Sequence, residues 1–186
     1  MENALILAGG KSSRMGLDKT LLAFENSPSF THFLYFRLKN IFQNVKVSAK
    51  NQKFNPPLPL IKDDFEDFCP LFVLASLDLY FDKKVFIIPA DTPFIKEKTI
   101  KKLFLESKNY EICVAKDKEK IHNLCGFFDP SISKKARNLL ENGQRKIKNL
   151  LEISNTKFVD FEDGEQFLNL NTKEDLRKIN EISTDF

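Results

Sequence analysis

The sequence has few cysteines and histidines, and it has no tryptophan. The cysteines are Cys69, Cys113 and Cys125, far apart and without a C-x-x-C pair, and the histidines are His32 and His122. Zinc sites group such ligands at short spacings, so this pattern disfavours zinc. An odd number of cysteines without a recognisable signal peptide fits a reducing environment. We therefore expect a cytoplasmic protein whose cysteines are small buried apolar residues.

Long apolar runs are also missing. The longest, such as Val85–Ala90 and Leu71–Leu77, are far too short to cross a bilayer. The formal net charge of +3 comes from 29 basic and 26 acidic side chains spread along the chain, which does not indicate a nucleic-acid surface. The 186 residues, 42% hydrophobic and 30% charged, are typical of one globular domain, residues 1–186. We expect neither a membrane segment nor a nucleic-acid partner.

Glycine is scarce, yet two of the six glycines follow a short apolar run near the start of the chain. The segment Leu5–Lys19 reads LILAGGKSSRMGLDK. Gly9 and Gly10 lack a Cβ, so the backbone there can pass close to a ligand and point successive N–H groups at an anion. Arg14 and Lys19 add cationic side chains suited to phosphate oxygens. This segment therefore predicts a phosphate-binding loop.

The spacing within this segment excludes the two commonest phosphate loops. A P-loop requires a glycine, four residues and then Gly-Lys-Ser/Thr, whereas Lys11 directly follows Gly10. The G-x-G-x-x-G fingerprint of dinucleotide-binding proteins is absent too, which argues against a nicotinamide dehydrogenase. A merely basic surface turn is the alternative, but Arg14, Gly16 and Lys19 at these offsets favour a phosphate site.

Strand-like and helix-like patterns alternate along the chain. The predicted strands are 4–8, 45–49, 58–61, 85–88, 111–115 and 157–161, and the predicted helices are 30–42, 70–80, 97–107, 132–142 and 173–182. The continuous apolar run 85–88 is typical of a central parallel strand buried on both faces. The alternation predicts a three-layer α/β fold with a mostly parallel central sheet.

Ligands of open α/β sheets bind beyond the carboxyl ends of the strands. Three such ends carry the chemistry here: the glycine segment, Asp63, and the sequence PADTP at 89–93. We expect these three segments to converge on one crevice. Asp91 is the candidate Mg²⁺ ligand, because this ion favours one or two carboxylates together with phosphate oxygens and water. The alternative for Asp91 is a turn acceptor that caps Thr92–Phe94.

Three blocks together resemble the molybdenum cofactor guanylyltransferases. They are LAGGKSSRMGLDK at 7–19, PADTPFI at 89–95 and NLNTKEDL at 169–176, in the order and at the spacing of that family. The resemblance implies a Rossmann-like nucleotidyltransferase fold with a nucleotide half at about 1–95 and an acceptor half at about 96–186. It also implies Mg²⁺-dependent transfer of GMP from GTP to Mo-molybdopterin, giving molybdopterin guanine dinucleotide and pyrophosphate.

The resemblance implies a role for each matching residue. Guanine and ribose would contact Leu7, Ala8, Gly9 and Gly10, and the triphosphate would contact Arg14 and Lys19. Ser48, Asp63 and Asp91 would also contact the nucleotide, and Asp91 would bind the metal. The acceptor would contact His122, Asn169 and Asn171. Arg14, Lys19 and Asp91 would form the catalytic set. Ser48 stands where the family can have asparagine, which shortens the polar reach. Helix capping is an equal alternative for Asn171, and a purely structural role is an alternative for His122.

The chain departs from the family pattern at two places. Cys69–Val73 reads CPLFV where the family has G-P-L-x-G, and Glu25–Ser29 replaces the family's N-G-K-P. Neither departure touches the expected triphosphate or metal residues, but both bear on recognition of the base and the pterin.

Other functions stay open at this point. The first is a sister nucleotidyltransferase that uses CTP or another acceptor, and the second is a non-catalytic nucleotide-binding regulator. A monomer is expected, with transient contact to a cofactor-biosynthesis protein that delivers the labile pterin.

Overall fold

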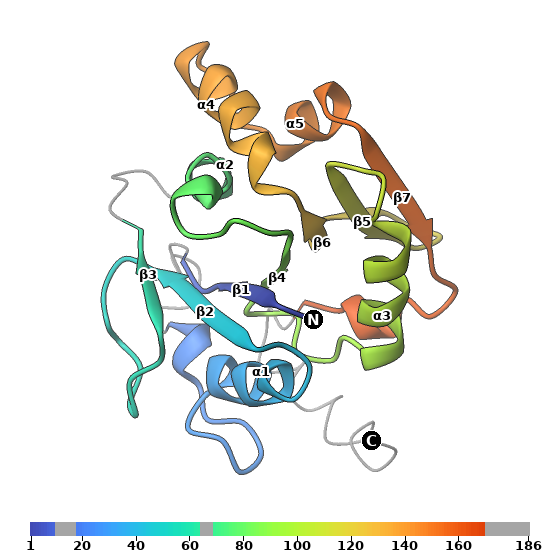
Figure 1. Cartoon of the computed structure of the whole chain (residues 1–186). Coiled ribbons are helices and arrows are strands. Elements are labelled where there is room, and N and C mark those ends of the chain that lie inside the picture. The colour runs from blue at the N-terminus through green and yellow to red at the C-terminus, as the bar shows by residue number, and fades with distance from the viewer. Residues whose placement is uncertain (10–17, 64–68, 170–186) are drawn as a thin grey trace.

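A seven-stranded sheet organises the computed structural model, which describes residues 1–9, 18–63 and 69–169 (Figure 1). The strand order is β3-β2-β1-β4-β6-β5-β7. The strands are β1 Asn3–Leu7, β2 Asn44–Ala49, β3 Leu60–Lys62, β4 Val85–Pro89, β5 Ile112–Lys116, β6 Ile121–Phe128 and β7 Thr156–Asp160. Only β6 runs antiparallel to its neighbours, so the described sheet is mostly parallel, as predicted.

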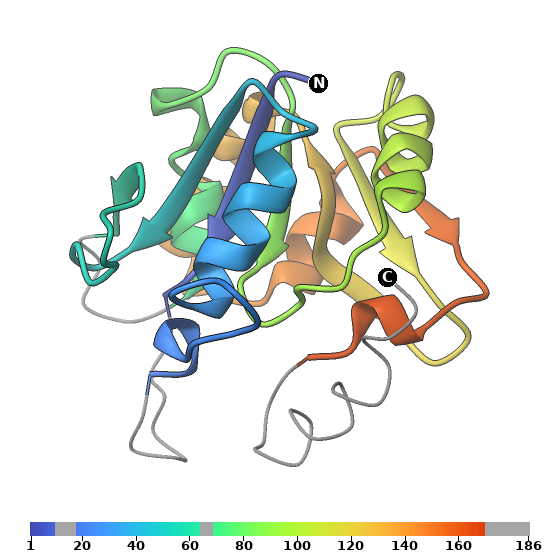
Figure 2. The ribbon, with the colours of Figure 1, turned by 90° about the horizontal axis from the view of Figure 1, so that it is seen from below.

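Helices cover both faces of the sheet, which confirms the three-layer α/β arrangement (Figures 1 and 2). One face carries α1 and α3, and the other carries α2, α4 and α5. The helices are α1 Phe30–Lys39, α2 Pro70–Leu74, α3 Glu97–Glu106, α4 Ser133–Glu141 and α5 Ile147–Ile153, with short 3-10 turns η1 Lys19–Leu21, η2 Leu77–Leu79, η3 Pro130–Ile132 and η4 Glu165–Phe167.

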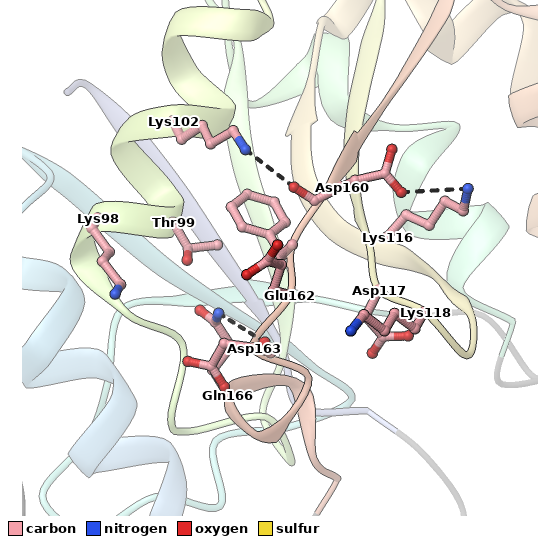
Figure 3. A pocket seen from close by; sticks show the side chains of 11 residues that line it. Lys98, Thr99, Lys102, Lys116, Asp117, Lys118, Asp160, Glu162, Asp163 and Gln166 are labelled. Carbon is pink, nitrogen blue, oxygen red and sulfur yellow. Dashed lines mark hydrogen bonds and ion pairs between the residues drawn. The ribbon is translucent and has the colours of Figure 1, made fainter.

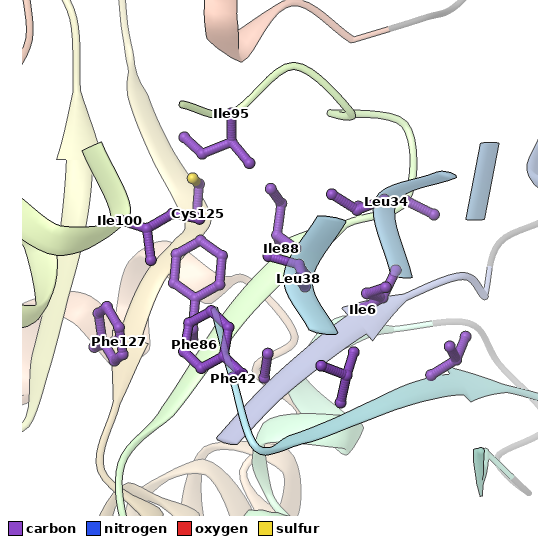
Figure 4. Close-up of a cluster of buried hydrophobic side chains, with 14 of the residues drawn as sticks. Ile6, Leu34, Leu38, Phe42, Phe86, Ile88, Ile95, Ile100, Cys125 and Phe127 are labelled. Carbon is purple, nitrogen blue, oxygen red and sulfur yellow. The ribbon is translucent and has the colours of Figure 1, made fainter. Parts of the chain in front are cut away.

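Phenylalanine fills much of the core on the α1 and α3 face (Figure 4). The rings of Phe42 and Phe86 stack with centroids 5.6 Å apart, and Phe127 lies 5.3 Å from Phe86. All residues of β1, and Val85–Ile88 of β4, are buried. These strands bury apolar residues on both faces of the sheet, which explains why their sequences are continuously apolar rather than alternating.

The predicted helix 70–80 is wrong in its length, because the structure divides it into α2 and η2. The hydroxyl of Ser133, which comes from α4, donates to the Leu74 carbonyl at 2.9 Å and accepts from the Asp78 N–H at 3.2 Å. These two bonds satisfy backbone groups at the break that a continuous helix would pair internally. Ser133, 59 positions after Leu74, therefore stabilises the end of the helix.

The prediction also missed β6 and α5. Strand β6 begins with the exposed Ile121, continues with the partly exposed His122 and Asn123 and has Gly126 in its interior, so its sequence lacks a clear strand pattern. Glycine is required there because a Cβ would lie 2.0 Å from the Cys113 carbonyl oxygen in β5. The predicted helix 173–182 lies outside the described residues.

Candidate active site

The carboxyl ends of β1, β2 and β4 lie side by side at one edge of the sheet (Figure 2). Leu7 is paired with Ser48 on one side and with Pro89 on the other. The Ala8 N–H donates to the Ser48 carbonyl at 2.9 Å, and the Ala90 N–H donates to the Leu7 carbonyl at 3.0 Å. The start of the glycine segment therefore lies beside the start of the DTP segment, as the sequence predicted.

The side chains of Leu7 and Ala8 are buried, with 6% and 1% exposure. Only backbone groups of these residues can face a nucleotide, in keeping with the expected mode of contact. Several of those groups already bond within the protein, including the Leu7 carbonyl and both backbone groups of Ala8. The next backbone donor along the chain is the N–H of Gly9.

Asp91 and Asn169 are brought together by a single threonine. The Thr92 side chain, 3% exposed, has its hydroxyl 3.1 Å from the Asn169 side-chain oxygen and 3.4 Å from an Asp91 carboxylate oxygen. The shorter contact is the stronger hydrogen bond, because such bonds weaken beyond about 3 Å. The tertiary structure thus places the predicted metal ligand next to the predicted acceptor residue, which lies in a distant block of the sequence.

Other predicted residues occupy the same edge or fall outside the described chain. Asp63 follows β3, donates its backbone N–H to the Ala49 carbonyl at 2.9 Å and is 5% exposed. Ser48 at the end of β2 is 2% exposed. Lys19 begins η1. Gly10, Arg14 and Asn171 lie outside the described residues.

Sequence reasoning missed an ion pair between the glycine segment and Lys53. The Lys53 ammonium donates to the Ala8 carbonyl at 2.9 Å and to an Asp18 carboxylate oxygen at 2.6 Å. The other Asp18 oxygen accepts from the backbone N–H and the hydroxyl of Thr20, at 3.1 and 2.6 Å. Burial alone would raise the Asp18 pKa, but the bonds from Lys53 and Thr20 outweigh it and lower the pKa. No local motif around Lys53 signals this contact.

His122 is held by two partners at the start of β6. Its Nε2 lies 2.8 Å from an Asp117 carboxylate oxygen, and its ring stacks on Phe167 with centroids 4.2 Å apart. The side chain is 9% exposed. Phe167 precedes Asn169 by two residues, so His122 lies next to the segment that carries the acceptor candidate.

Burial and hydrogen bonding shift the pKa values of both Asp117 and His122. Burial would raise the Asp117 pKa, but backbone N–H groups of Lys120 and Glu119, together with His122, lower it to about 2. Asp117 is therefore ionised at neutral pH and accepts a hydrogen bond from His122 Nε2. Burial also lowers the pKa of His122 and outweighs the opposing effect of Asp117. The imidazole is thus neutral, with its proton on Nε2.

We expect the free energy of unfolding to fall as the pH drops from about 7.5 to about 5.5. The pKa of His122 in the folded protein lies below its usual value of 6.5, so the unfolded chain takes up the proton first. The neutral histidine contributes stability above about pH 6.5, and acidification removes it. Asp117 contributes only to a second loss at lower pH, between 3.8 and about 2.

Urea unfolding at both pH values tests this expectation. The His122→Asn variant should show a smaller loss of stability over the same interval, because it lacks the titrating imidazole. An equal loss in the variant and the parent would contradict the assignment of the pH dependence to His122.

An open pocket of about 840 Å³ lies next to α3 and the ends of β5 and β7 (Figure 3). Its lining residues are Lys98, Thr99, Lys102, Lys116, Asp117, Lys118, Asp160, Phe161, Glu162, Asp163 and Gln166. Two of its lysines bond to Asp160 in the same wall: Lys116 to the carboxylate at 3.4 Å and Lys102 to the carbonyl at 3.1 Å. No residue predicted to contact the nucleotide or the acceptor lines this pocket.

The described part of the chain contains no group of three or more histidine, cysteine, aspartate or glutamate side chains that could hold a metal ion. A site with one protein carboxylate still suits Mg²⁺, because the ion is commonly held by one or two carboxylates together with substrate phosphates. Within 1–9, 18–63 and 69–169, no helix is long and apolar enough to cross a membrane.

Comparison with known proteins gives a consistent family. The family described as the MobA-like NTP transferase domain matches residues 4–158. A molybdenum cofactor guanylyltransferase of Campylobacter jejuni is 42% identical over 181 residues, covering 95% of this chain and 94% of that protein. One from Helicobacter pylori is 30% identical over 178 residues, covering 92% and 84%.

A solved structure supports the fold. Molybdopterin-guanine dinucleotide biosynthesis protein A from Archaeoglobus fulgidus has a TM-score of 0.80 at 20% identity, covering 99% of this chain and 100% of that chain. At this identity the likeness establishes the fold alone. The match over residues 4–158 and the 42% identity to a full-length relative decide the family. The chain belongs to the MobA-like NTP transferase family, together with the molybdenum cofactor guanylyltransferases.

Proposed function

We propose that the protein transfers GMP from GTP to Mo-molybdopterin, forming molybdopterin guanine dinucleotide and releasing pyrophosphate. The relatives at 42% and 30% identity, both named molybdenum cofactor guanylyltransferase, support this activity. The structural observation that carries it is the contact of Thr92 with both Asp91 and Asn169. In this proposal the contact links the residue assigned to the metal with a residue assigned to the acceptor.

The proposed reaction requires no protein nucleophile. A phosphate oxygen of molybdopterin attacks the α-phosphorus of GTP in line, a new oxygen–phosphorus bond forms, and the bond to the β-phosphate breaks. Catalysis then consists of positioning the two phosphates and stabilising their charge. Mg²⁺, when bound, would neutralise charge on the phosphate oxygens.

The proposal assigns a binding role to each group of residues at the carboxyl ends of the strands. The backbone from Leu7 to Gly10 holds guanine and ribose, Ser48 and Asp63 lie beside the nucleotide, and Arg14 and Lys19 hold the triphosphate. Asp91 supplies the carboxylate for Mg²⁺. The acceptor side comprises Asn169, Asn171 and His122, with His122 held by Asp117 and Phe167. The proposal includes a monomeric cytoplasmic enzyme that receives molybdopterin from another cofactor-biosynthesis protein.

Nucleotide choice tests the proposed activity. Calorimetric titration of the purified protein with GTP and with CTP, each with Mg²⁺, should show preferential binding of GTP. A molybdopterin transfer assay should then yield the guanine dinucleotide and pyrophosphate. Preference for CTP would favour a sister nucleotidyltransferase, and GTP binding without transfer would favour a nucleotide-binding regulator.

Lys19→Ala is expected to lower kcat/KM for GTP. The corresponding loss of transition-state stabilisation should be about 2–4 kcal/mol, by analogy with the loss of one preorganised charged contact. A compact ammonium at the triphosphate would act on both the bound nucleotide and the transition state. Steady-state kinetics with each substrate varied in turn measures the effect. A change confined to the KM for molybdopterin would place Lys19 on the acceptor instead.

A further inference from the structure

Lys53 makes a link that no predicted motif accounts for. Its ammonium connects Ala8, at the end of β1, to Asp18, which precedes η1. These two described residues lie on either side of the stretch 10–17 in the sequence. Lys53 itself belongs to the connection between β2 and β3, far from both in the sequence. Its side chain is 19% exposed, so this charge is largely withdrawn from water.

The connection that carries Lys53 is anchored on both sides of this residue. The Gln52 side chain donates to the Leu58 carbonyl at 2.8 Å. Phe54 is 4% exposed and packs edge-on against the buried His32 ring at 6.0 Å. The neighbours of Lys53 are therefore fixed by packing and hydrogen bonding, so its ammonium is presented from a defined position.

The bond from Lys53 to the Ala8 carbonyl sets the orientation of the following peptide. A trans peptide is planar, and its C=O and N–H groups point in opposite directions. The Ala8 N–H is already fixed by the Ser48 carbonyl. With the Ala8 carbonyl held toward Lys53, the N–H of Gly9 is directed away from Lys53. This N–H is one of the backbone donors assigned to the nucleotide.

The second bond of Lys53 is to Asp18, on the C-terminal side of the stretch 10–17. Asp18 accepts from the Thr20 N–H and hydroxyl, and its carbonyl accepts from the Leu21 N–H at 3.0 Å. Asp18 thereby organises η1, the turn that begins with Lys19. Lys53 fixes the carboxylate that organises this turn. One ammonium thus constrains both the peptide before Gly9 and the backbone of Lys19.

We propose that Lys53 is a positioning residue for the GTP site. It acts through Ala8 and Asp18: it orients the Gly9 N–H toward guanine and ribose and holds the turn that places Lys19 at the triphosphate, and it supplies no group to the acceptor. This inference rests on the proposed function. It predicts that removing the Lys53 charge impairs GTP binding selectively.

Lys53→Met tests the proposal, because methionine keeps an unbranched apolar side chain and removes the ammonium. We expect the Kd and KM for GTP to rise about tenfold, with the KM for molybdopterin changed less than twofold. Lys53→Arg should recover much of the affinity. Lys39→Met is the matched control, since Lys39 also donates to a backbone carbonyl, that of Gln43, but lies at the end of α1. The control should bind GTP like the parent.

The outcomes separate this inference from the proposed function. If the parent protein uses CTP instead of GTP, the proposed function fails. If the parent uses GTP and a folded Lys53→Met variant binds it normally, the role of Lys53 is overturned. An equal rise in both KM values, or no recovery with arginine, would also overturn it. Should Lys53→Met not fold, Asp18→Asn must produce the same GTP-selective loss, and normal GTP binding by that variant would refute the proposal.

Discussion

Asp91→Asn is expected to reduce the rate of Mg²⁺-dependent transfer about a hundredfold to a thousandfold while the protein stays folded. This corresponds to an activation free energy higher by about 2.7–4 kcal/mol. Asparagine has nearly the same shape as aspartate but lacks the charge that attracts a divalent cation. Asp91 follows a buried central strand and lies beside the Thr92 contact to Asn169. In the proposed reaction this carboxylate is assigned to the place where the phosphates of both substrates meet.

The same variant distinguishes the metal role from a turn-capping role. The side-chain oxygen of asparagine can still accept the hydrogen bonds of a turn, so a capping Asp91 would tolerate the change. Transfer rates at saturating GTP over a range of Mg²⁺ concentrations provide the measurement. Near-normal turnover by the folded variant would refute the metal assignment.

Asp129→Asn is the matched control. Asp129 also follows a strand, β6, and its carboxylate accepts from the Ser131 N–H at 3.0 Å. Because β6 runs antiparallel to β4, this aspartate lies at the opposite edge of the sheet. Asparagine preserves the cap, so the control should retain full transfer activity. A loss of activity in both variants would indicate a general effect of removing a carboxylate.

Gly126→Ala is expected to destabilise the protein by about 3 kcal/mol or more, by overpacking. The new Cβ would lie 2.0 Å from the Cys113 carbonyl oxygen and 2.7 Å from the Val114 Cα. Both are backbone atoms of β5, so no side chain can rotate away to relieve the clash. Strand β6 lies between β4 and β5, and its shift would disturb pairing on both sides.

Thermal unfolding measures this effect, and Gly143→Ala is its matched control. About 3 kcal/mol corresponds to a decrease in Tm of about 6–12 °C for a chain of this length. Gly143 has φ of +72°, but nothing lies within 4 Å of its added Cβ. Its substitution should cost only the strain of the left-handed backbone, about 1–2 kcal/mol. Similar Tm values for the two variants would contradict the steric argument.

Local sequence was sufficient for most strands and helices of the described residues. The continuously apolar strands 4–8 and 85–88 were predicted because burial on both faces leaves no room for polar residues. Gly143, with its positive φ, follows α4 and marks the predicted end of that helix. The alternation of strands and helices was enough for the fold class. The roles of all the predicted site residues stay predictions, and Gly10, Arg14 and Asn171 lie outside the described residues.

The missed features all depend on partners distant in the sequence. The helix predicted at 70–80 is interrupted because Ser133 bonds to its backbone from α4. Strand β6 could not be recognised from its residues, since Gly126 is selected by the closeness of β5 rather than by strand propensity. Lys53 has no local signature, because its partners Ala8 and Asp18 are brought to it only by folding.

The sequence by itself determined the family blocks, the central apolar strands and the chemical types of the candidate residues. These depend on local composition and spacing, which are visible in a linear chain. Only the tertiary structure decided that Thr92 joins Asp91 to Asn169 and that Lys53 joins Ala8 to Asp18. Such contacts depend on strand order and register, which arise from packing of the whole sheet and are encoded by no single segment.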